Sequence, residues 1–263
     1  MTAIVAISDL DERTLLRELT HRINNELVFS INAVSAAAVR ADNPEVKVAL
    51  SNVVDLLQHQ ADVHRILRIP DGDDLVDAAE YIRKLGSAVS RGMLERLGIR
   101  LALAADTLPL QLERCWRLAL AAHELLRNVA RHACFDGRDG SIKVKLTLAD
   151  TVVNCIIADN GSLPTRLRPG RGLQIVSNLA RSLGGRLEYG SGAQFTSFLL
   201  VFPLTEREQK ANRVAAQRRA KSARRCKTVA PLSRPQLEAA KPALDAMLGV
   251  PKHLRAAPRT AHD

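Results

Sequence analysis

The chain has 263 residues, of which 46% are hydrophobic and 3% aromatic, so it can bury the core of one large domain or two small ones. No run approaches the ~18 apolar residues of a membrane-spanning helix, and the N-terminus lacks the basic start and apolar centre of a signal peptide. We therefore expect a cytoplasmic protein without membrane insertion. The formal charge of +10 lies almost entirely in residues 205–263, which hold 14 Lys and Arg and 5 Asp and Glu. The basic charge is thus a property of this C-terminal extension, and residues 1–204 are nearly neutral.

Residues 10–39 carry the pattern of an amphipathic helix. Six apolar residues fall within about 60° of one line on a wheel with about 100° per residue. These residues are Leu16, Leu19, Ile23, Leu27, Ile31 and Val34. His21 lies about 140° from Leu16 on this wheel, and Asn25 follows His21 at i+4 on nearly the same bearing. The helix is expected to pack one side and to expose a His and an Asn on the other.

The next segment predicts a turn and a second helix over residues 44–67. Asn43 can cap the N-terminus of this helix, and Pro44 suits its first position. A hairpin of two such helices cannot bury both apolar stripes alone, so we expect a homodimer in which two hairpins form a four-helix bundle. Residues 1–70 are the predicted dimerisation domain.

Residues 71–204 change to a mixed pattern that indicates an α+β sandwich with helices on one face of the sheet. The predicted elements are helices at 75–97, 112–133 and 172–183, strands at 99–104, 141–149 and 151–159, and two more strands ending at Pro203. Residues 205–263 are punctuated by Pro, Lys and Arg, and predict a separate, partly disordered extension with one or two weak helices. The four cysteines have no metal-ligand spacing, so we expect them to be ordinary core or surface residues.

His21 is the first candidate for chemistry. A neutral imidazole is a good nucleophile near pH 7, and one exposed on a rigid bundle can receive a phosphoryl group from another domain. Asn25 can orient the ring, and Arg22 can interact with the arriving phosphate charge. A lone exposed His is more often an ordinary surface residue, so this interpretation depends on the second half of the chain.

The predicted helix at 112–133 carries a polar row. Glu124, Asn128 and His132 stand at successive i+4 positions and therefore on one face. A carboxylate and an amide oxygen suit Mg²⁺, which prefers oxygen ligands and bridges to nucleotide phosphates. Such a pair is usually just a solvated helix face, and it gains meaning only together with the motifs that follow.

Two glycine-containing motifs come after this helix. Asp159 ends an apolar strand, where its carboxylate can accept a hydrogen bond from an exocyclic amine, and Gly161 allows close approach of a base. Gly170 and Gly172 precede the predicted helix at 172–183, whose free backbone N–H groups attract phosphate. In this order and spacing the three motifs together indicate a nucleotide site.

The ordered set resembles the histidine kinases whose ATP domain has the Bergerat (GHKL) fold. Within them it is similar to the subclass whose acceptor motif begins His-Arg and has Asn four residues after the His. The resemblance covers residues 10–204. It implies that His21 is the phosphoacceptor, that Arg22 and Asn25 are its companions, and that Glu124 is the carboxylate that activates it.

For the nucleotide, the resemblance implies ATP and Mg²⁺ as cofactors. Asn128 matches the Mg²⁺ ligand, and Arg131 matches a basic phosphate contact. Asp159 with Gly161 matches the adenine-binding turn, and Thr196 matches a threonine that supports adenine binding.

The glycine motif that closes the ATP lid is matched by Gly170, Gly172 and Leu173. The adenine turn departs from the family pattern, because Leu163 and Pro164 follow where the family carries a second glycine, and the lid before Gly170 is short. A stiffer turn restricts the approach of the base. We therefore expect ATP binding that is present but weak.

These features predict an ATP-dependent protein-histidine kinase that autophosphorylates His21 and passes the phosphoryl group to an Asp of a response-regulator receiver domain. One alternative is a histidine phosphotransferase with a degenerate ATP domain. Another is a dimeric binding protein whose basic tail, residues 205–263, contacts nucleic acid or an acidic partner.

Overall fold

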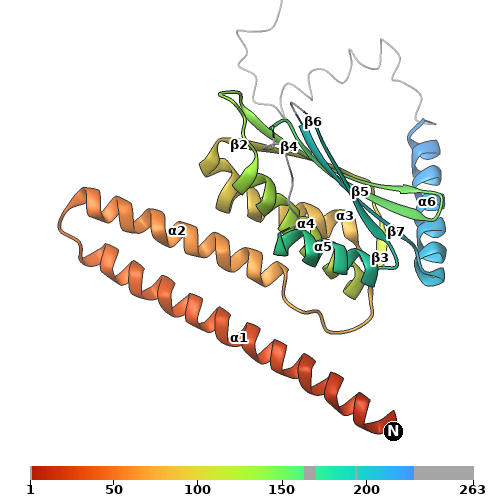
Figure 1. The fold of residues 1–263 in the computed structure, drawn as a ribbon, viewed down its shortest axis with the longest axis horizontal. Coiled ribbons are helices and arrows are strands. Elements are labelled where there is room, and N and C mark those ends of the chain that lie inside the picture. Colours follow the sequence, from red (N-terminus) through yellow and green to blue (C-terminus); the bar gives the residue numbers. More distant parts are fainter. Residues whose placement is uncertain (1, 163–169, 193–194, 228–263) are drawn as a thin grey trace, which may run out of the picture. The chain divides into compact units, whose positions relative to one another are not determined.

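The computed structural model of the chain describes residues 2–162, 170–192 and 195–227 (Figure 1). Its contacts define two compact units, Met1–Ala215 and Ala216–Asp263. The first unit contains a helical hairpin and an α+β sandwich, as the sequence predicts. None of the described helices is both long and apolar enough to cross a membrane.

The hairpin consists of α1 (Thr2–Arg40) and α2 (Pro44–Ile66), which run side by side (Figure 1). Asn43 caps α2, since its side chain accepts a hydrogen bond from Glu45 N at 2.8 Å, and Pro44 holds the first helical position. α1 begins eight residues before the predicted start, because nothing between residues 2 and 10 breaks a helix. Leu16, Leu19 and Ile23 are at least half exposed, so one protomer leaves this apolar stripe uncovered.

The sandwich holds the end of α2 by two hydrogen bonds. Tyr81 Oη donates to Ile66 O, and Trp116 Nε1 donates to Leu67 O at 2.8 Å. The last carbonyls of a helix have no partner within it, so these donors satisfy groups that would otherwise need water. The junction of hairpin and sandwich is therefore a specific contact.

The helix predicted over residues 75–97 is wrong at both ends. Leu75–Asp77 form a strand, β1, which pairs antiparallel with a short strand, β3 (Pro109–Gln111), that the sequence did not reveal. Asp77 then caps α3 (Ala78–Val89), because its Oδ1 accepts from Ala79 N at 3.0 Å and from Leu108 N at 2.8 Å. The helix next widens into a π turn, η1 (Ser90–Leu94), and tightens into a 3₁₀ turn, η2 (Glu95–Leu97).

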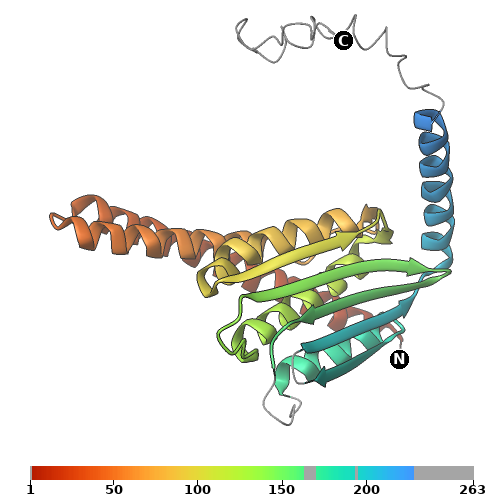
Figure 2. The same ribbon diagram turned by 90° about the horizontal axis from the view of Figure 1, so that it is seen from above.

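The main sheet has five strands in the order β2-β4-β5-β7-β6 (Figure 2). Their bounds are β2 Ile99–Ala105, β4 Gly140–Ala149, β5 Val152–Asp159, β6 Arg186–Gly192 and β7 Phe195–Pro203. β2 pairs parallel with β4, and all the other pairs are antiparallel. Helices α3, α4 (Leu112–His132) and α5 (Arg171–Ser182) lie together on one face of this sheet (Figure 1).

The core lies between these helices and the sheet. The inward positions alternate along β4, β5 and β7, as expected for strands with one buried face. They meet the apolar side of α4, whose outer side carries the polar row. Fully buried members of this core include Leu118, Leu125, Ile142, Ile157, Leu200 and Phe202.

The C-terminal extension does not begin as a separate tail. Thr205 precedes α6 (Glu206–Lys227), and Glu208 and Asn212 in its first two turns are buried. The compact unit consequently runs on to Ala215, beyond the predicted boundary after residue 204. One or two helices were predicted within residues 205–263, and α6 is one helix in that range; the part of the extension after residue 227 lies outside the described residues.

A glycine at the turn after α5 provides a test of this packing. A Cβ on Gly185 would lie 1.9 Å from Val201 O and 2.6 Å from Phe202 Cβ, so Gly185→Ala must displace backbone. We expect it to lower the free energy of unfolding by at least about 2 kcal/mol. Gly190→Ala is the matched control, because its nearest neighbour would be Ser197 Oγ at 3.9 Å. Chemical denaturation measures both, and equal stability of the two variants would contradict the packing.

Candidate functional site

A cavity of about 240 Å³ opens between α4, α5 and the ends of β5 and β7. Its lining residues are Asn128, Val129, His132, Ala133, Asp159, Gly170, Gly172, Leu173, Thr196 and Phe198. Six of the predicted nucleotide-binding residues are therefore gathered around one cavity, although they span 69 positions of the sequence from Asn128 to Thr196. Arg131 and Gly161 are outside this lining, and Arg131 is exposed on α4.

α4 and α5 approach each other closely at the cavity. A Cβ on Gly172 would lie 3.2 Å from Asn128 Oδ1 and 3.3 Å from Glu124 Oε2. A glycine here lets the first turn of α5 reach the polar face of α4. Glu124 also forms an ion pair with Arg127, with 3.0 Å between Arg127 Nη1 and Glu124 Oε1.

This corner has the donor chemistry that Mg²⁺ needs. Asn128 Oδ1 and the Glu124 carboxylate are hard oxygen ligands. In the part of the chain that the structure describes, no cluster of three His, Cys, Asp or Glu side chains could hold a metal by itself. A Mg²⁺ ion would therefore take most of its remaining ligands from nucleotide phosphates and water, which is the usual behaviour of this ion.

Asp159 and Thr196 form the polar floor of the cavity. They stand opposite each other in the β5–β7 register and are 5% and 1% exposed. Asp159 Oδ1 accepts a hydrogen bond from Gly161 N at 2.9 Å. Burial raises the pKa of Asp159, and this hydrogen bond offsets part of the rise. Thr196 Oγ1 is buried without a hydrogen-bond partner among the described residues.

The turn after Asp159 is held against the end of α4. A Cβ on Gly161 would meet Ala133 Cβ at 3.0 Å and Cys134 O at 3.2 Å, so a larger residue would have to push these neighbours by a few tenths of an ångström. Ser162 and Cys134 exchange backbone hydrogen bonds of 2.8 and 3.0 Å. Leu163 and Pro164, which the sequence identified as a departure from the family pattern, lie outside the described residues.

α5 supplies backbone donors at the rim of the cavity. Gly170 is its N-cap and offers no side chain, so the first N–H groups of the helix remain available to an anion. Leu173 is buried behind them and anchors the turn in the core.

The predicted acceptor site lies on the exposed side of α1. Asn25 Nδ2 is 3.2 Å from His21 Nδ1, as the i+4 spacing implies. Arg22 is not free, because its Nε forms a 2.9 Å ion pair with Glu18 Oε1, and Arg22 lowers the pKa of Glu18. Both partners are well exposed, so an arriving phosphate could displace this pair at little cost.

Sequence reasoning did not assign several groups that line or adjoin the cavity. Val129 and Phe198 supply apolar walls of the cavity. The only signal for them in the sequence is that they are apolar residues close to Asn128 and Thr196. His123, next to Glu124 in the sequence, is largely buried, and burial lowers its pKa to about 4.

The chain thus combines a helical hairpin that carries an exposed His–Asn pair with an α+β sandwich that contains a glycine-lined cavity. Residues 18–92 match the family described as histidine kinase, and residues 94–196 match the family described as histidine kinase-like ATPase domain. The chain belongs to the histidine kinases with a GHKL-type ATPase domain.

Individual relatives agree with this assignment. Blue-light-activated histidine kinase 2 of Erythrobacter litoralis (strain HTCC2594) is 23% identical over 211 residues, which cover 76% of this chain and 60% of that protein. The chain therefore spans less than two thirds of this relative. The histidine kinase domain of the Erythrobacter litoralis EL346 blue-light activated histidine kinase superposes with a TM-score of 0.50 at 20% identity. That alignment covers 71% of this chain and 98% of the other and supports the fold.

The raised pKa of Asp159 gives a stability prediction with a defined sign. A buried carboxyl whose pKa lies above its ordinary value of 3.8 costs stability once pH exceeds the folded-state pKa, and this cost disappears below pH 3.8. Asp159→Asn removes the charge but keeps an oxygen for Gly161 N. We expect this variant to be more stable than the parent at pH 7, with the difference vanishing near pH 3.

The comparison needs an exposed carboxylate as control, and Asp106→Asn supplies it. Urea unfolding of the three proteins at pH 3 and pH 7 measures the effect. A loss of stability in Asp159→Asn that is the same at both pH values would contradict the argument.

Proposed function

We propose that the chain is an ATP-dependent protein-histidine kinase. ATP and Mg²⁺ bind in the cavity between α4 and α5, the γ-phosphoryl group passes to His21, and the phosphohistidine then donates it to an Asp of a response-regulator receiver domain. The observation that carries this proposal is the convergence of a buried carboxylate, an unpartnered hydroxyl and a helix N-terminus on one cavity.

The adenine end of ATP is assigned to the floor of the cavity. The Asp159 carboxylate accepts a hydrogen bond from the exocyclic amine, and Thr196 Oγ1, which has no partner among the described residues, supplies a second polar contact. Val129, Leu173 and Phe198 contact the faces of the base. Recognition by buried polar groups discriminates strongly against bases that leave those groups unpaired.

The phosphate end is assigned to the rim. Asn128 binds Mg²⁺ through its amide oxygen, the N–H groups of the first turn of α5 bind phosphate oxygens, and the exposed Arg131 adds positive charge. A Mg²⁺ ion held there would supply positive charge against the nucleotide phosphates. Positioning and charge neutralisation provide most of the rate enhancement in phosphoryl transfer.

In the transfer step, an imidazole nitrogen of His21 attacks the γ-phosphorus in line with the leaving oxygen of ADP. A new N–P bond forms as the β–γ bridging O–P bond breaks, and the imidazole proton leaves to a base. Asn25 holds Nδ1 of the ring. Glu124, at the edge of the ATP cavity, accepts that proton or orients the ring.

The homodimer is proposed from the uncovered stripe on the hairpin. Leu16, Leu19, Ile23, Val53 and Leu56 are between 38% and 56% exposed in one protomer. Pairing two hairpins into a four-helix bundle buries this apolar surface on both chains. In this arrangement residues 1–70 act as the dimerisation and acceptor domain and residues 71–204 as the ATP domain.

The first test is the site of labelling. Incubation with γ-labelled ATP and Mg²⁺ is expected to give an acid-labile label, because an N–P bond hydrolyses in acid. The variant His21→Ala is expected to lose this label completely. His64→Gln is the control, since His64 is also exposed and lies on the other helix of the same hairpin. Equal labelling of His21→Ala and the parent would exclude His21 as the acceptor.

The second test addresses nucleotide binding. Thr196→Val keeps the shape of the side chain but removes the unpartnered hydroxyl, so we expect ATP to bind about tenfold more weakly, or ~1.4 kcal/mol. Stability should not fall, because the side chain of Thr196 makes no hydrogen bond to any described residue in the free protein. Thr147→Val, on β4 and away from the cavity, is the control.

Calorimetric titration with ATP and Mg²⁺ gives the affinities, and thermal unfolding gives the stabilities. Equal affinity of Thr196→Val and Thr147→Val for ATP would show that Thr196 does not contribute to ATP binding. If the parent protein binds no ATP at millimolar concentration but exchanges phosphate between His21 and a receiver domain, the histidine phosphotransferase interpretation replaces the kinase.

A further inference from the structure

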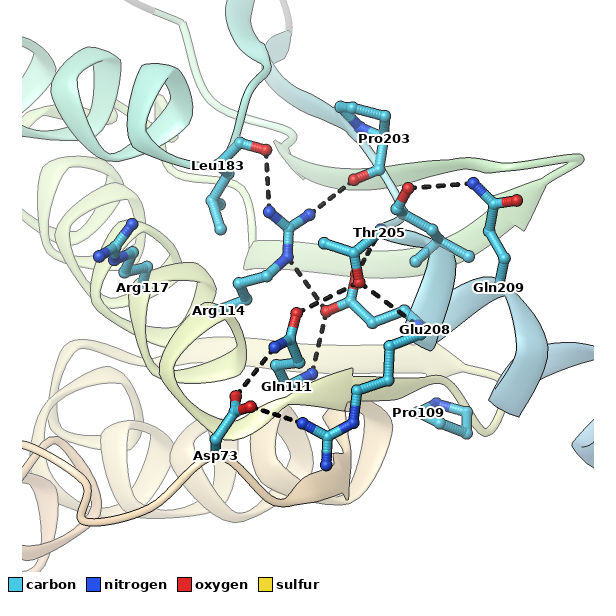
Figure 3. A network of polar contacts seen from close by, with 12 residues as sticks. Asp73, Pro109, Gln111, Arg114, Arg117, Leu183, Pro203, Thr205, Glu208 and Gln209 are labelled. Carbon is cyan, nitrogen blue, oxygen red and sulfur yellow. Dashed lines mark hydrogen bonds and ion pairs between the residues drawn. The ribbon is translucent and has the colours of Figure 1, made fainter.

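A buried polar network joins α6 to the sandwich at the opposite end from the cavity (Figure 3). Its centre is Arg114, in the first turn of α4. Arg114 donates to Glu208 Oε1 at 3.0 Å, to Leu183 O at 3.2 Å and to Pro203 O at 2.6 Å. One side chain therefore connects α4 with the C-terminal ends of α5 and β7 and with α6.

Glu208 completes this network and is itself fully buried. Its Oε1 also accepts from Gln111 N at 2.9 Å, and its Oε2 accepts from Thr205 N at 2.9 Å. Glu208 N donates in return to Thr205 Oγ1 at 3.3 Å, which forms a capping box at the start of α6. Both carboxylate oxygens thus meet only N–H donors, which is the condition under which a buried charge is tolerated.

Three of the elements that Arg114 connects, α4, α5 and β7, also line the cavity with their other ends. Asn128 lies 14 residues further along α4, or about 21 Å at the rise of an α-helix. Gly172 lies in the first turn of α5, whose C-cap is Leu183, and Thr196 is the second residue of β7, whose last residue is Pro203. Since helices and strands are stiff, holding their far ends fixes how their near ends meet at the cavity.

The spacing of groups around the cavity is sensitive to this alignment. The first turn of α5 comes so close to Asn128 and Glu124 that a Cβ on Gly172 would already be 3.2–3.3 Å from their side chains. A small rotation of α5 relative to α4 would therefore change the spacing between the phosphate-binding amides and the Mg²⁺ ligand.

α6 also holds the segment that leads out of the hairpin. Arg207 Nη1 lies 2.5 Å from Asp73 Oδ2, and Gln111 Nε2 donates to Asp73 Oδ1 at 2.8 Å (Figure 3). Leu112 N donates to Asp74 O at 2.8 Å. The first turn of α6, the start of α4 and the segment between α2 and β1 are consequently one connected assembly.

We propose that Glu208 is a positioning residue for the nucleotide cavity. Acting through Arg114, it sets the separation of α4, α5 and β7, and thereby the affinity for ATP, from a helix that opens the basic C-terminal extension. The inference rests on the proposed function, because it concerns the binding of ATP in that cavity. It gives the C-terminal segment a part in nucleotide binding without any contact with the nucleotide.

Glu208→Gln is the informative variant. The glutamine has the same size, but an amide NH₂ replaces one of the two carboxylate oxygens. Either Arg114 and Gln111 N or Thr205 N then faces a donor instead of an acceptor. The network is therefore misaligned, although no cavity is created. We expect the KM for ATP in autophosphorylation to rise about tenfold, with kcat changed by less than twofold. Arg114→Lys, which keeps the charge but cannot reach both carbonyls, should behave in the same way.

Arg213→Gln, on the exposed side of α6, is the matched control and should leave both constants unchanged. A residue that only stabilises the fold would, when replaced, reduce the fraction of active protein, which lowers kcat at constant KM. That result for Glu208→Gln, or an unchanged KM, would overturn the inference. Circular dichroism at the assay temperature verifies that each variant is folded.

Titration with ADP and Mg²⁺ separates this inference from the proposed function. If the parent protein neither binds nucleotide nor becomes labelled, the proposed function has failed. If the parent binds and is labelled while Glu208→Gln binds ADP with parental affinity, the proposed function stands and the positioning role is excluded.

Discussion

Gly172 brings the first turn of α5 against the polar face of α4, where even one additional carbon atom would lie 3.2–3.3 Å from Asn128 and Glu124. The sandwich is arranged so that this contact can exist. α4 packs its apolar side on the sheet and leaves its polar row outward, and α5 lies beside it with its N-terminus at that row. Asp159 and Thr196 close the cavity from the sheet side. A polar corner thus forms without interrupting the apolar core behind it.

The elements that the sequence predicted well are those with a strong local pattern. The hairpin, α4, α5 and the central strands have clear periodicities. The start of α2 is marked locally, by the capping residue Asn43 and by Pro44 at the first helical position. β1 and β3 were missed because three residues are too few to show an alternation. Asp77, which caps α3 through Ala79 N, also accepts a hydrogen bond from Leu108 N, 31 residues away, and no local pattern can reveal that second bond.

The same distinction applies to the candidate site. Glu124, Asn128, Asp159 and the glycines could be identified because residue type and spacing together suggest their chemistry, and the cavity gathers most of them. The apolar walls could not, because Phe198 looks like any other inward strand residue. The role of α6 was also hidden. Thr205 and Glu208 have the spacing of a capping box, but the partner Arg114 lies 94 residues earlier.

The contact between Trp116 and the end of α2 has a practical consequence. Trp116 is the single tryptophan of the chain, and its indole N–H is bound to Leu67 O where the hairpin meets the sandwich. Indole emission responds to the polarity and hydrogen bonding around the ring. The native protein therefore contains an optical probe at the joint between its helical hairpin and its sandwich, and any rearrangement of that joint can be followed by fluorescence without attaching a dye.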